Sequence, residues 1–102
     1  MQFLILAHDG NDENALERRM SVRPKHLENM MKLKDEGHVM AAGGLIEDGG
    51  RLAGSYLVMD FESREALDEY LAGEPYVAAG VWQDITIEVC NTVILGKDVI
   101  GG

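Results

Sequence analysis

The chain has 102 residues, 46% of them apolar and 26% charged, which suits one compact domain with a single core. Its 9 Lys and Arg residues stand against 18 Asp and Glu, for a net charge of -9. That balance excludes nucleic acid as the main partner and disfavours anionic lipid surfaces, because both are bound through clustered cations.

Other features limit where the protein works. The longest apolar runs fall short of the roughly 20 residues needed to span a bilayer, and no membrane partner is expected. The N-terminal residues lack the charged start and the cleavage pattern of a signal peptide. Cys90 is the single cysteine, so an internal disulfide or a thiolate metal site is excluded. We therefore expect a cytoplasmic protein made of one domain, residues 1–102.

The first half of the chain predicts a strand, a helix and a second strand. Residues 2–8 are apolar at nearly every position, and residues 9–20 open with a run of turn formers. A helix is predicted from Ser21 to Glu36, with Pro24 in its first turn and Gly37 ending it. The second strand is expected at 38–43.

The second half of the chain predicts the same order of strand, helix and strand. A turn at 48–50 precedes a strand at 54–61, and Ser63 is a suitable N-cap for a second helix that stops at Gly73. Residues 84–95 alternate between apolar and polar side chains, which predicts a last strand.

The order strand–helix–strand–strand–helix–strand predicts an α+β fold of the ferredoxin-like βαββαβ type. Its four-stranded antiparallel sheet carries both helices on one face. Residues 3–6 and 56–59 are apolar on both faces of their strands, which indicates that both faces are buried. A second copy of the chain, packed sheet on sheet, is the simplest cover for the free face.

His26 is the main candidate for chemistry. On a helical wheel it lies at the edge of a stripe formed by Leu27, Met30, Met31 and Leu33, where its ring can face a cleft. Asp9 follows the first strand and is expected to pair with His26, fixing the tautomer and leaving one ring nitrogen for proton transfer. Asp35 lies roughly 13 Å further along the helix axis and is not expected to reach it.

A facial metal site made by His8, Asp9 and His26 is a further alternative, because two histidines and a carboxylate suit iron or zinc. Neighbouring strand residues point to opposite faces, so His8 and Asp9 would need a kink to converge. We therefore expect no metal.

Four segments resemble the YCII-related (YciI-like) family of small bacterial proteins. They are residues 16–27 (LERRMSVRPKHL), Ala42-Gly43-Gly44, Gly54-Ser55, and residues 74–81 (EPYVAAGV). Many relatives have Asp-Pro-Tyr where this chain has Glu74-Pro75-Tyr76. The resemblance implies a dimeric α+β barrel, with two ferredoxin-like sheets packed face to face. It also implies a pocket with a histidine–aspartate pair, carried over as His26 and Asp9.

The resemblance further implies the type of reaction. A characterised relative is a dehydrochlorinase of a chlorinated hydroxyhydroquinone, and the fold also resembles muconolactone isomerase. The leading hypothesis is therefore a cofactor-independent lyase or isomerase that moves protons on a small cyclic oxygenated substrate. The expected catalytic residues are His26 and Asp9, and the expected substrate-binding residues are Arg23, Gly43, Ser55, Pro75 and Tyr76. The alternative is a dimeric module that binds a small ligand without turnover.

Overall fold

The computed structural model describes residues 1–101 and contains the predicted order of six main elements. They are β1 (Gln2–Asp9), α1 (Ala15–Asp35), β2 (Val39–Ile46), β3 (Leu52–Asp60), α2 (Arg64–Ala72) and β4 (Trp82–Cys90). A one-turn helix, α3 (Pro75–Ala78), precedes β4, and a small hairpin of β5 (Ile94–Leu95) and β6 (Asp98–Val99) follows it.

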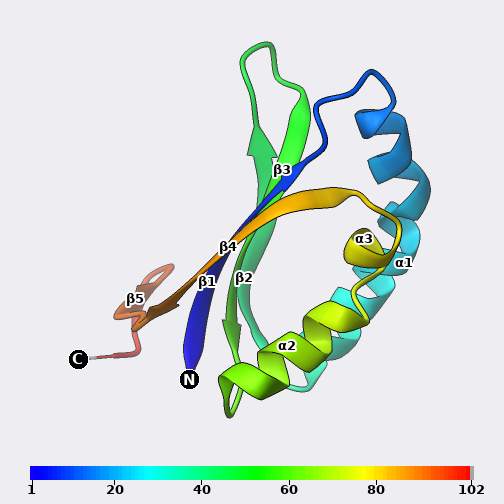
Figure 1. Ribbon diagram of the computed structural model, residues 1–102. Coiled ribbons are helices and arrows are strands. Elements are labelled where there is room, and N and C mark those ends of the chain that lie inside the picture. Colours follow the sequence, from blue (N-terminus) through cyan, green and yellow to red (C-terminus); the bar gives the residue numbers. More distant parts are fainter. Residues whose placement is uncertain (102) are drawn as a thin grey trace.

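The four long strands form one sheet in the order β2-β3-β1-β4, and every neighbouring pair is antiparallel. The helices cover one face of this sheet, and the other face carries no helix (Figure 1). The predicted α+β, ferredoxin-like architecture is therefore confirmed.

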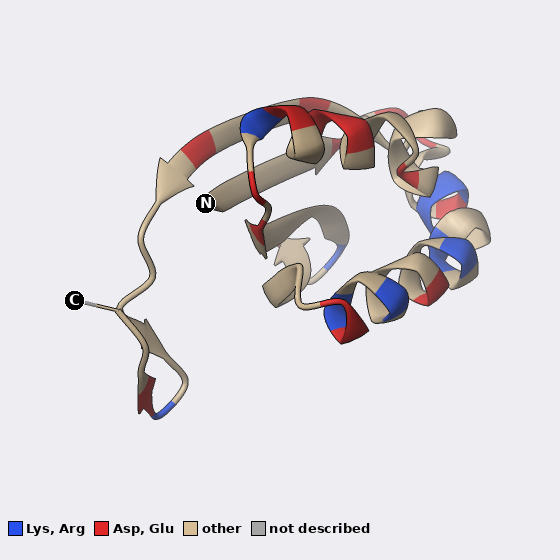
Figure 2. Ribbon diagram, turned by 90° about the horizontal axis from the view of Figure 1, so that it is seen from below, with Lys and Arg blue, Asp and Glu red and all other residues tan. Residues whose placement is uncertain are grey.

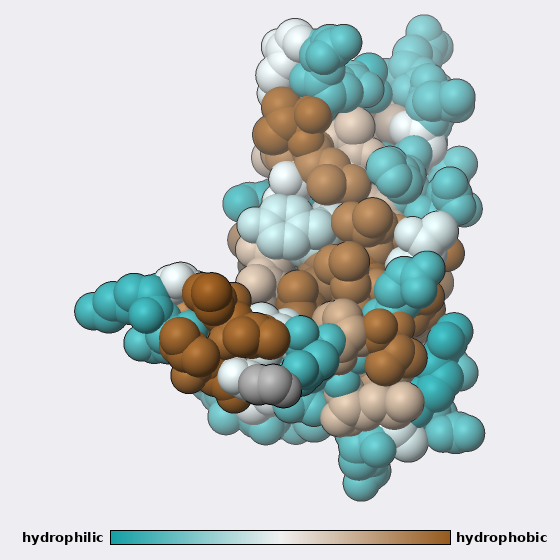
Figure 3. All heavy atoms as spheres, turned by 90° about the vertical axis from the view of Figure 1, so that its left-hand side faces the viewer, coloured by the Kyte–Doolittle hydropathy of each residue, from teal (hydrophilic) through white to brown (hydrophobic). Residues whose placement is uncertain are grey.

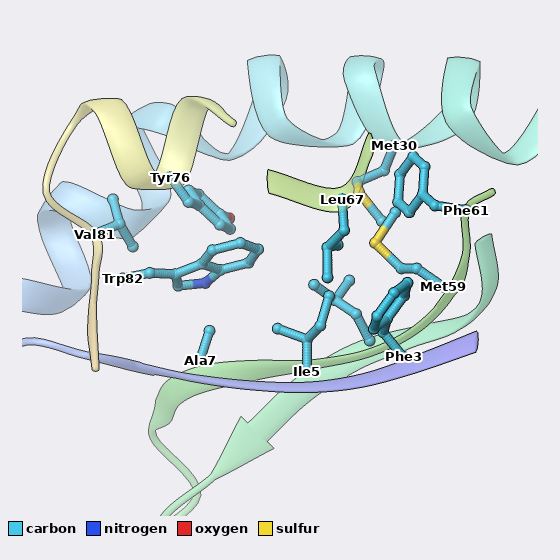
Figure 4. Close-up of a cluster of buried hydrophobic side chains, with 11 residues drawn as sticks. Phe3, Ile5, Ala7, Met30, Met59, Phe61, Leu67, Tyr76, Val81 and Trp82 are labelled. Atoms are coloured by element: carbon cyan, nitrogen blue, oxygen red, sulfur yellow. The ribbon is translucent and has the colours of Figure 1, made fainter. Parts of the chain in front are cut away.

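The core fills the space between the sheet and the helices (Figure 4). Alternate residues of the two central strands point into it, and each is at most 1% exposed: Phe3, Ile5, Ala7, Leu57 and Met59. Leu67 of α2 and Met30 of α1 close this core from the helix side. At one end the packing becomes aromatic, where Tyr76 and Trp82 meet the sheet.

The intervening residues of the central strands lie on the open face of the sheet. The register pairs Leu4 with Val58 and Leu6 with Tyr56, so four apolar or aromatic side chains share this face. Figure 3 shows the apolar surface that they and their neighbours present. Tyr56 is exposed, while Leu4, Leu6 and Val58 are only half-buried.

The long helix departs from its predicted start. It begins at Ala15, six residues before Ser21, because Asp12 and Asn14 already provide acceptors for its first turn. Pro24 consequently lies inside α1 rather than in its first turn. Proline has no N–H, so the helix lacks one internal hydrogen bond there.

The last strand also differs from the prediction. It ends at Cys90, and the alternating residues beyond it form the β5–β6 hairpin instead of continuing the sheet. A positive φ at Gly96 makes the tight hairpin turn possible.

Within the described residues, no helix is long and apolar enough to cross a membrane.

Candidate active site

His26 lies in the middle of the buried face of α1. The buried residues of this helix are Ala15, Arg19, His26 and Met30, spaced four, seven and four apart, which places them on one side. Leu27 and Met31, predicted to define that stripe, are exposed. The predicted position of His26 at the edge of the stripe is therefore wrong: polar side chains occupy the centre of the stripe, and apolar periodicity could not reveal them.

The carboxylate that binds His26 is Glu74. Nδ1 of His26 lies 2.6 Å from Oε1 of Glu74, and the Glu74 side chain has no exposed surface. The Tyr70 hydroxyl donates to Oε2 of Glu74, and the backbone N–H of Tyr76 donates to Oε1 at 3.2 Å. Burial of this carboxylate is tolerable because both of its oxygens have donors.

Local sequence explains how Glu74 reaches this position. Residues that precede proline favour extended backbone, and Glu74 has φ -68° and ψ 123° before Pro75. Pro75 starts α3, and the Glu74 side chain caps that helix. The same side chain thus caps a helix and binds the histidine.

Two aromatic rings fix the plane of the imidazole. Tyr76 stacks on His26 with ring centroids 3.9 Å apart, and Trp82 meets it edge-on at 5.6 Å. An ionised carboxylate only accepts hydrogen bonds, so Nδ1 of His26 carries the proton whenever it pairs with the carboxylate form of Glu74.

The other ring nitrogen is accessible. Within residues 1–101, Arg19 Nε is the buried side-chain nitrogen or oxygen that lacks a hydrogen-bond partner. Nε2 of His26 has no protein partner either, and it therefore retains accessible surface at the cavity that His26 lines. A neutral His26 offers a lone pair there, and a protonated one offers a proton.

Arg19 organises a second buried cluster. One of its terminal nitrogens, Nη1, contacts both carboxylate oxygens of Asp9, at 3.0 and 3.1 Å. The other, Nη2, donates to Oγ of Ser55 at 2.9 Å, and the guanidinium lies 5.0 Å from the ring centre of Tyr76. Trp82 Nε1 also donates to Oγ of Ser55, so the Ser55 hydroxyl accepts twice and keeps its own proton to donate.

The predicted hydrogen bond between Asp9 and His26 is therefore wrong. Asp9 forms the ion pair with Arg19, and Glu74 takes the place at His26 that was expected for Asp9. The register of β1 against β4 shifts by one residue between His8 and Asp9, with Gln83 as the extra residue. Asp9 is buried beyond this shift and His8 is exposed.

A cavity of about 260 Å³ opens between α1 and the β2–β3 half of the sheet. Its walls combine polar side chains at one end with apolar side chains and glycine backbone at the other: Arg19, Arg23, His26, Leu27, Met30, Ala42, Gly43, Gly44, Leu52, Ser55, Leu57 and Tyr76. A six-membered ring fits, since about 150 Å³ already holds benzene.

Of the predicted binding residues, Arg23, Gly43, Ser55 and Tyr76 line this cavity beside His26. Pro75 does not; it lies on the outer side of α3 among surface residues such as Lys25 and Ala78. Position 43 has no room for a side chain, because a Cβ there would lie 2.5 Å from the Tyr56 ring on the open face. The alternative metal site has no support in residues 1–101, which contain no group of three metal-ligating side chains.

The cavity is lined by positively charged side chains, although the chain as a whole is negatively charged. Six of the nine Lys and Arg residues lie on α1, where Figure 2 shows the basic bands. Two of these six, Arg19 and Arg23, line the cavity. Arg19 is already paired with Asp9, whereas Arg23 is exposed and forms no ion pair with a described residue. The cavity therefore suits a small ligand with anionic or electron-rich oxygens.

Comparisons with known proteins agree with this architecture. The profile of the YCII-related domain matches residues 1–91. The chain is 38% identical over 94 residues to protein YciI of Escherichia coli O6:H1, an alignment that covers 86% of this chain and 94% of that protein. It is 33% identical, with the same coverage, to an uncharacterized protein of Haemophilus influenzae.

Among solved structures, one neighbour is the 5-chloro-2-hydroxyhydroquinone dehydrochlorinase (TftG) of Burkholderia phenoliruptrix, in complex with 2,5-dihydroxybenzoquinone. The TM-score is 0.79 at 24% sequence identity, over 89% of this chain and 94% of that one. The chain thus has the same fold as this neighbour, with a four-stranded antiparallel sheet and helices on one face. The chain belongs to the YCII-related family.

Both tyrosines near His26 keep their protons. Burial, and then the charge of Glu74, raises the pKa of Tyr70 far above its ordinary value of 10.0. Burial also raises the pKa of Tyr76, although the guanidinium groups of Arg19 and Arg23 act in the opposite direction. Tyr70 therefore remains a hydrogen-bond donor to Glu74 above pH 10, where a free tyrosine loses its proton.

This predicts an alkaline contribution of Tyr70 to stability. Above about pH 10 the unfolded chain loses the Tyr70 proton and the folded chain keeps it, so the free energy of unfolding falls by up to about 1.4 kcal/mol per pH unit. Tyr70→Phe should remove this part of the slope. It should also cost about 1–3 kcal/mol at neutral pH, because Oε2 of Glu74 loses its donor.

The measurement is urea unfolding between pH 8 and pH 11. Glu69→Gln, at the exposed position beside Tyr70 on α2, is the control and should keep the wild-type slope, because a carboxyl group does not titrate between pH 8 and pH 11. An identical alkaline slope in the wild type and in Tyr70→Phe would contradict the buried hydrogen bond.

Proposed function

We propose that this protein is a lyase or isomerase that needs no cofactor and moves protons on a small cyclic oxygenated substrate in the cavity. The observation that carries the proposal is the buried His26–Glu74 pair, which leaves the second ring nitrogen of His26 unpaired beside a ring-sized cavity that His26 and two arginines line. A purely structural histidine has no need of a cavity, of an accessible nitrogen or of neighbouring cations.

His26 is proposed as the general acid and base. With Nδ1 bound to Glu74, the imidazole accepts a substrate proton at Nε2, and the carboxylate stabilises the imidazolium that forms. Stacking on Tyr76 holds the ring in place while the proton moves. The same nitrogen then returns the proton to a different substrate atom, so His26 ends each cycle unchanged.

The cations are proposed to hold the substrate oxygens. Arg23 lies at the cavity wall and forms no ion pair within residues 1–101, and the Ser55 hydroxyl can donate into the cavity. Asp9 acts on the substrate only through Arg19, whose guanidinium it fixes against Ser55 and Tyr76. Charge that develops on an enolate oxygen would be stabilised by these preset donors.

The dehydrochlorinase neighbour suggests a concrete reaction of this type. A ring hydroxyl gives its proton to His26 and becomes a carbonyl, and His26 delivers that proton to the ring carbon that carries chlorine. A second hydroxyl then gives its proton to His26 and becomes a carbonyl as the carbon–chlorine bond breaks. Chloride leaves with the electron pair of that bond, and His26 releases the proton to solvent. The products are a hydroxyquinone and HCl, and no outside oxidant is required.

Replacing His26 by Asn should keep the shape of the site and remove proton transfer. General acid–base catalysis contributes typically 10²–10⁴-fold, so we expect kcat to fall by at least about 100-fold. The assay is chloride release from 5-chloro-2-hydroxyhydroquinone, together with deuterium uptake from D₂O into the ring of 2,5-dihydroxybenzoquinone.

Lys25→Asn, at the exposed neighbouring position, is the control and should be fully active. His26→Asn with unchanged rates would refute the proposal. Binding of 2,5-dihydroxybenzoquinone by the wild type, with neither chloride release nor deuterium uptake, would favour the alternative of a ligand-binding module without turnover.

We also propose that the protein is a homodimer in which the open faces of two sheets pack together. The support is the patch of Leu4, Leu6, Tyr56 and Val58, which no element of the same chain covers. Two such faces should bury more than roughly 1,000 Å² in total, the level of a stable interface.

Val58→Glu places a charge in this interface and should convert the dimer to a monomer at micromolar concentration, as measured by light scattering. Ala72→Glu, which adds the same charge at an exposed position of α2 on the other face of the sheet, is the control and should stay dimeric. A wild-type protein that is monomeric at micromolar concentration would contradict the proposal.

A further inference from the structure

The β5–β6 hairpin stands apart from the domain on the open side of the sheet (Figures 1 and 2). Residues 92–101, which we call the arm, make one hydrogen bond to the rest of the described chain, from the Thr92 N–H to Oε1 of Gln2 at 2.7 Å. They also lie beyond the part of the chain that the YCII-related profile matches. The arm is therefore an addition to the family domain, and a single hydrogen bond holds it to that domain.

The arm carries apolar side chains that its own chain leaves uncovered. Val93, Ile94, Val99 and Ile100 are between 42% and 74% exposed. Figure 3 shows this apolar cluster projecting from the body of the molecule. A two-stranded hairpin is only marginally stable alone in water and needs a hydrophobic surface to pack on. The arm therefore requires a partner surface.

A matching surface lies on α1. Leu16, Met20, Leu27 and Met31 are between 36% and 56% exposed. At 100° per residue they fall within a band of about 60°, so they form one apolar stripe along the helix. The stripe is spaced like a helix face that packs against another element, but no element of the described chain covers it.

The stripe borders the candidate active site. Leu27 belongs both to the stripe and to the wall of the cavity, and Arg23 lies next to it on the helix surface. The opposite wall is formed by β2, an edge strand of the sheet. Anything that packs on the stripe beside β2 therefore covers the side of the cavity between them.

The sheet order separates the arm from the stripe of the same chain. The arm continues from β4, and β4 and β2 are the two opposite edges of the sheet. Residues 92–96 extend about 16 Å at about 3.3 Å per residue, whereas face-to-face sheets pack about 10 Å apart. An arm at the open side is thus long enough to cross to the second copy's sheet and reach its edge strand β2, beside which the stripe lies.

We infer that the arm of one copy packs on the α1 stripe of a second copy and closes the cavity beside His26 there. This inference rests on the face-to-face dimer proposed above. Each cavity would then be completed by apolar residues of the other chain, which accounts for both uncovered surfaces at once.

The test is cysteine cross-linking between two different variants, both with Cys90→Ser. One carries Ile94→Cys or Val99→Cys in the arm, and the other carries Met20→Cys or Met31→Cys in the stripe. All four positions are exposed, so none of these changes disturbs the fold of the single chain. After the two variants exchange subunits under mild oxidation, at least one pair should give a disulfide-linked dimer on a non-reducing gel.

Lys25→Cys, on the opposite side of α1 from the stripe, is the matched control and should not cross-link. Equal cross-linking of Lys25→Cys, or none at the stripe in a protein that light scattering shows to be dimeric, would overturn the inference. A monomeric wild type would overturn the face-to-face dimer and the inference together, without bearing on catalysis by His26.

Closure of the cavity by the arm can be tested separately, through the chemical accessibility of His26. The rate at which diethyl pyrocarbonate modifies His26, followed by mass spectrometry of its peptide, should rise at least about three-fold when Ile94 and Val99 are both changed to Asp. An unchanged rate would show that the arm does not cover the cavity.

Discussion

The site depends on a buried hydrogen bond between His26 and Glu74. An unpaired carboxylate at this depth would be too costly, so every feature around Glu74 serves to supply donors. Tyr70 comes from the last turns of α2, Tyr76 from α3 and His26 from α1, and all three converge on one side chain. The pair thereby joins three helices at one point, and it sets which nitrogen of His26 faces the cavity.

The Asp9–Arg19 ion pair holds a buried cation near the same cavity. It fastens the end of β1 to α1, and through Ser55 it also connects to β3 and Trp82. The two clusters meet at Tyr76, whose ring contacts both the imidazole and the guanidinium. A proton-transferring group and a cation are thus held on either side of one aromatic ring, although the chain as a whole carries a net charge of -9.

The order of elements followed from the sequence because hydrophobic period, turn residues and caps all agreed, as at Ser63 and Gly73. His26 was found as well, since it stands within a recognisable motif. Its hydrogen-bond partner, Glu74, was not predicted. Asp9 is nearer in the chain and adjoins the helix in any βαβ unit, whereas Glu74 is 48 residues away. Only the packing of α3 against α1 brings Glu74 close. The position of Glu74 before Pro75 and Tyr76, at the head of a motif, was the available signal.

The same limit applies to Arg19 and to the start of α1. A buried arginine breaks the apolar pattern by which helix faces are recognised, and its burial follows from Asp9 and Ser55, which lie on two different strands. Such tertiary compensation leaves no periodic trace in the chain. The sites that sequence patterns miss are those where polar residues occupy core positions, and here they form the candidate active site.

Glu74, and not Asp9, holds the imidazole of His26. Nitrogen-15 NMR of the ring tests it most directly, because the two nitrogens of a neutral histidine have well separated shifts. We expect a proton on Nδ1 and a free Nε2 in the wild type, a changed tautomer balance in Glu74→Gln, and the wild-type pattern in Asp9→Asn. A proton on Nε2 in the wild type, or a larger change in Asp9→Asn than in Glu74→Gln, would contradict it.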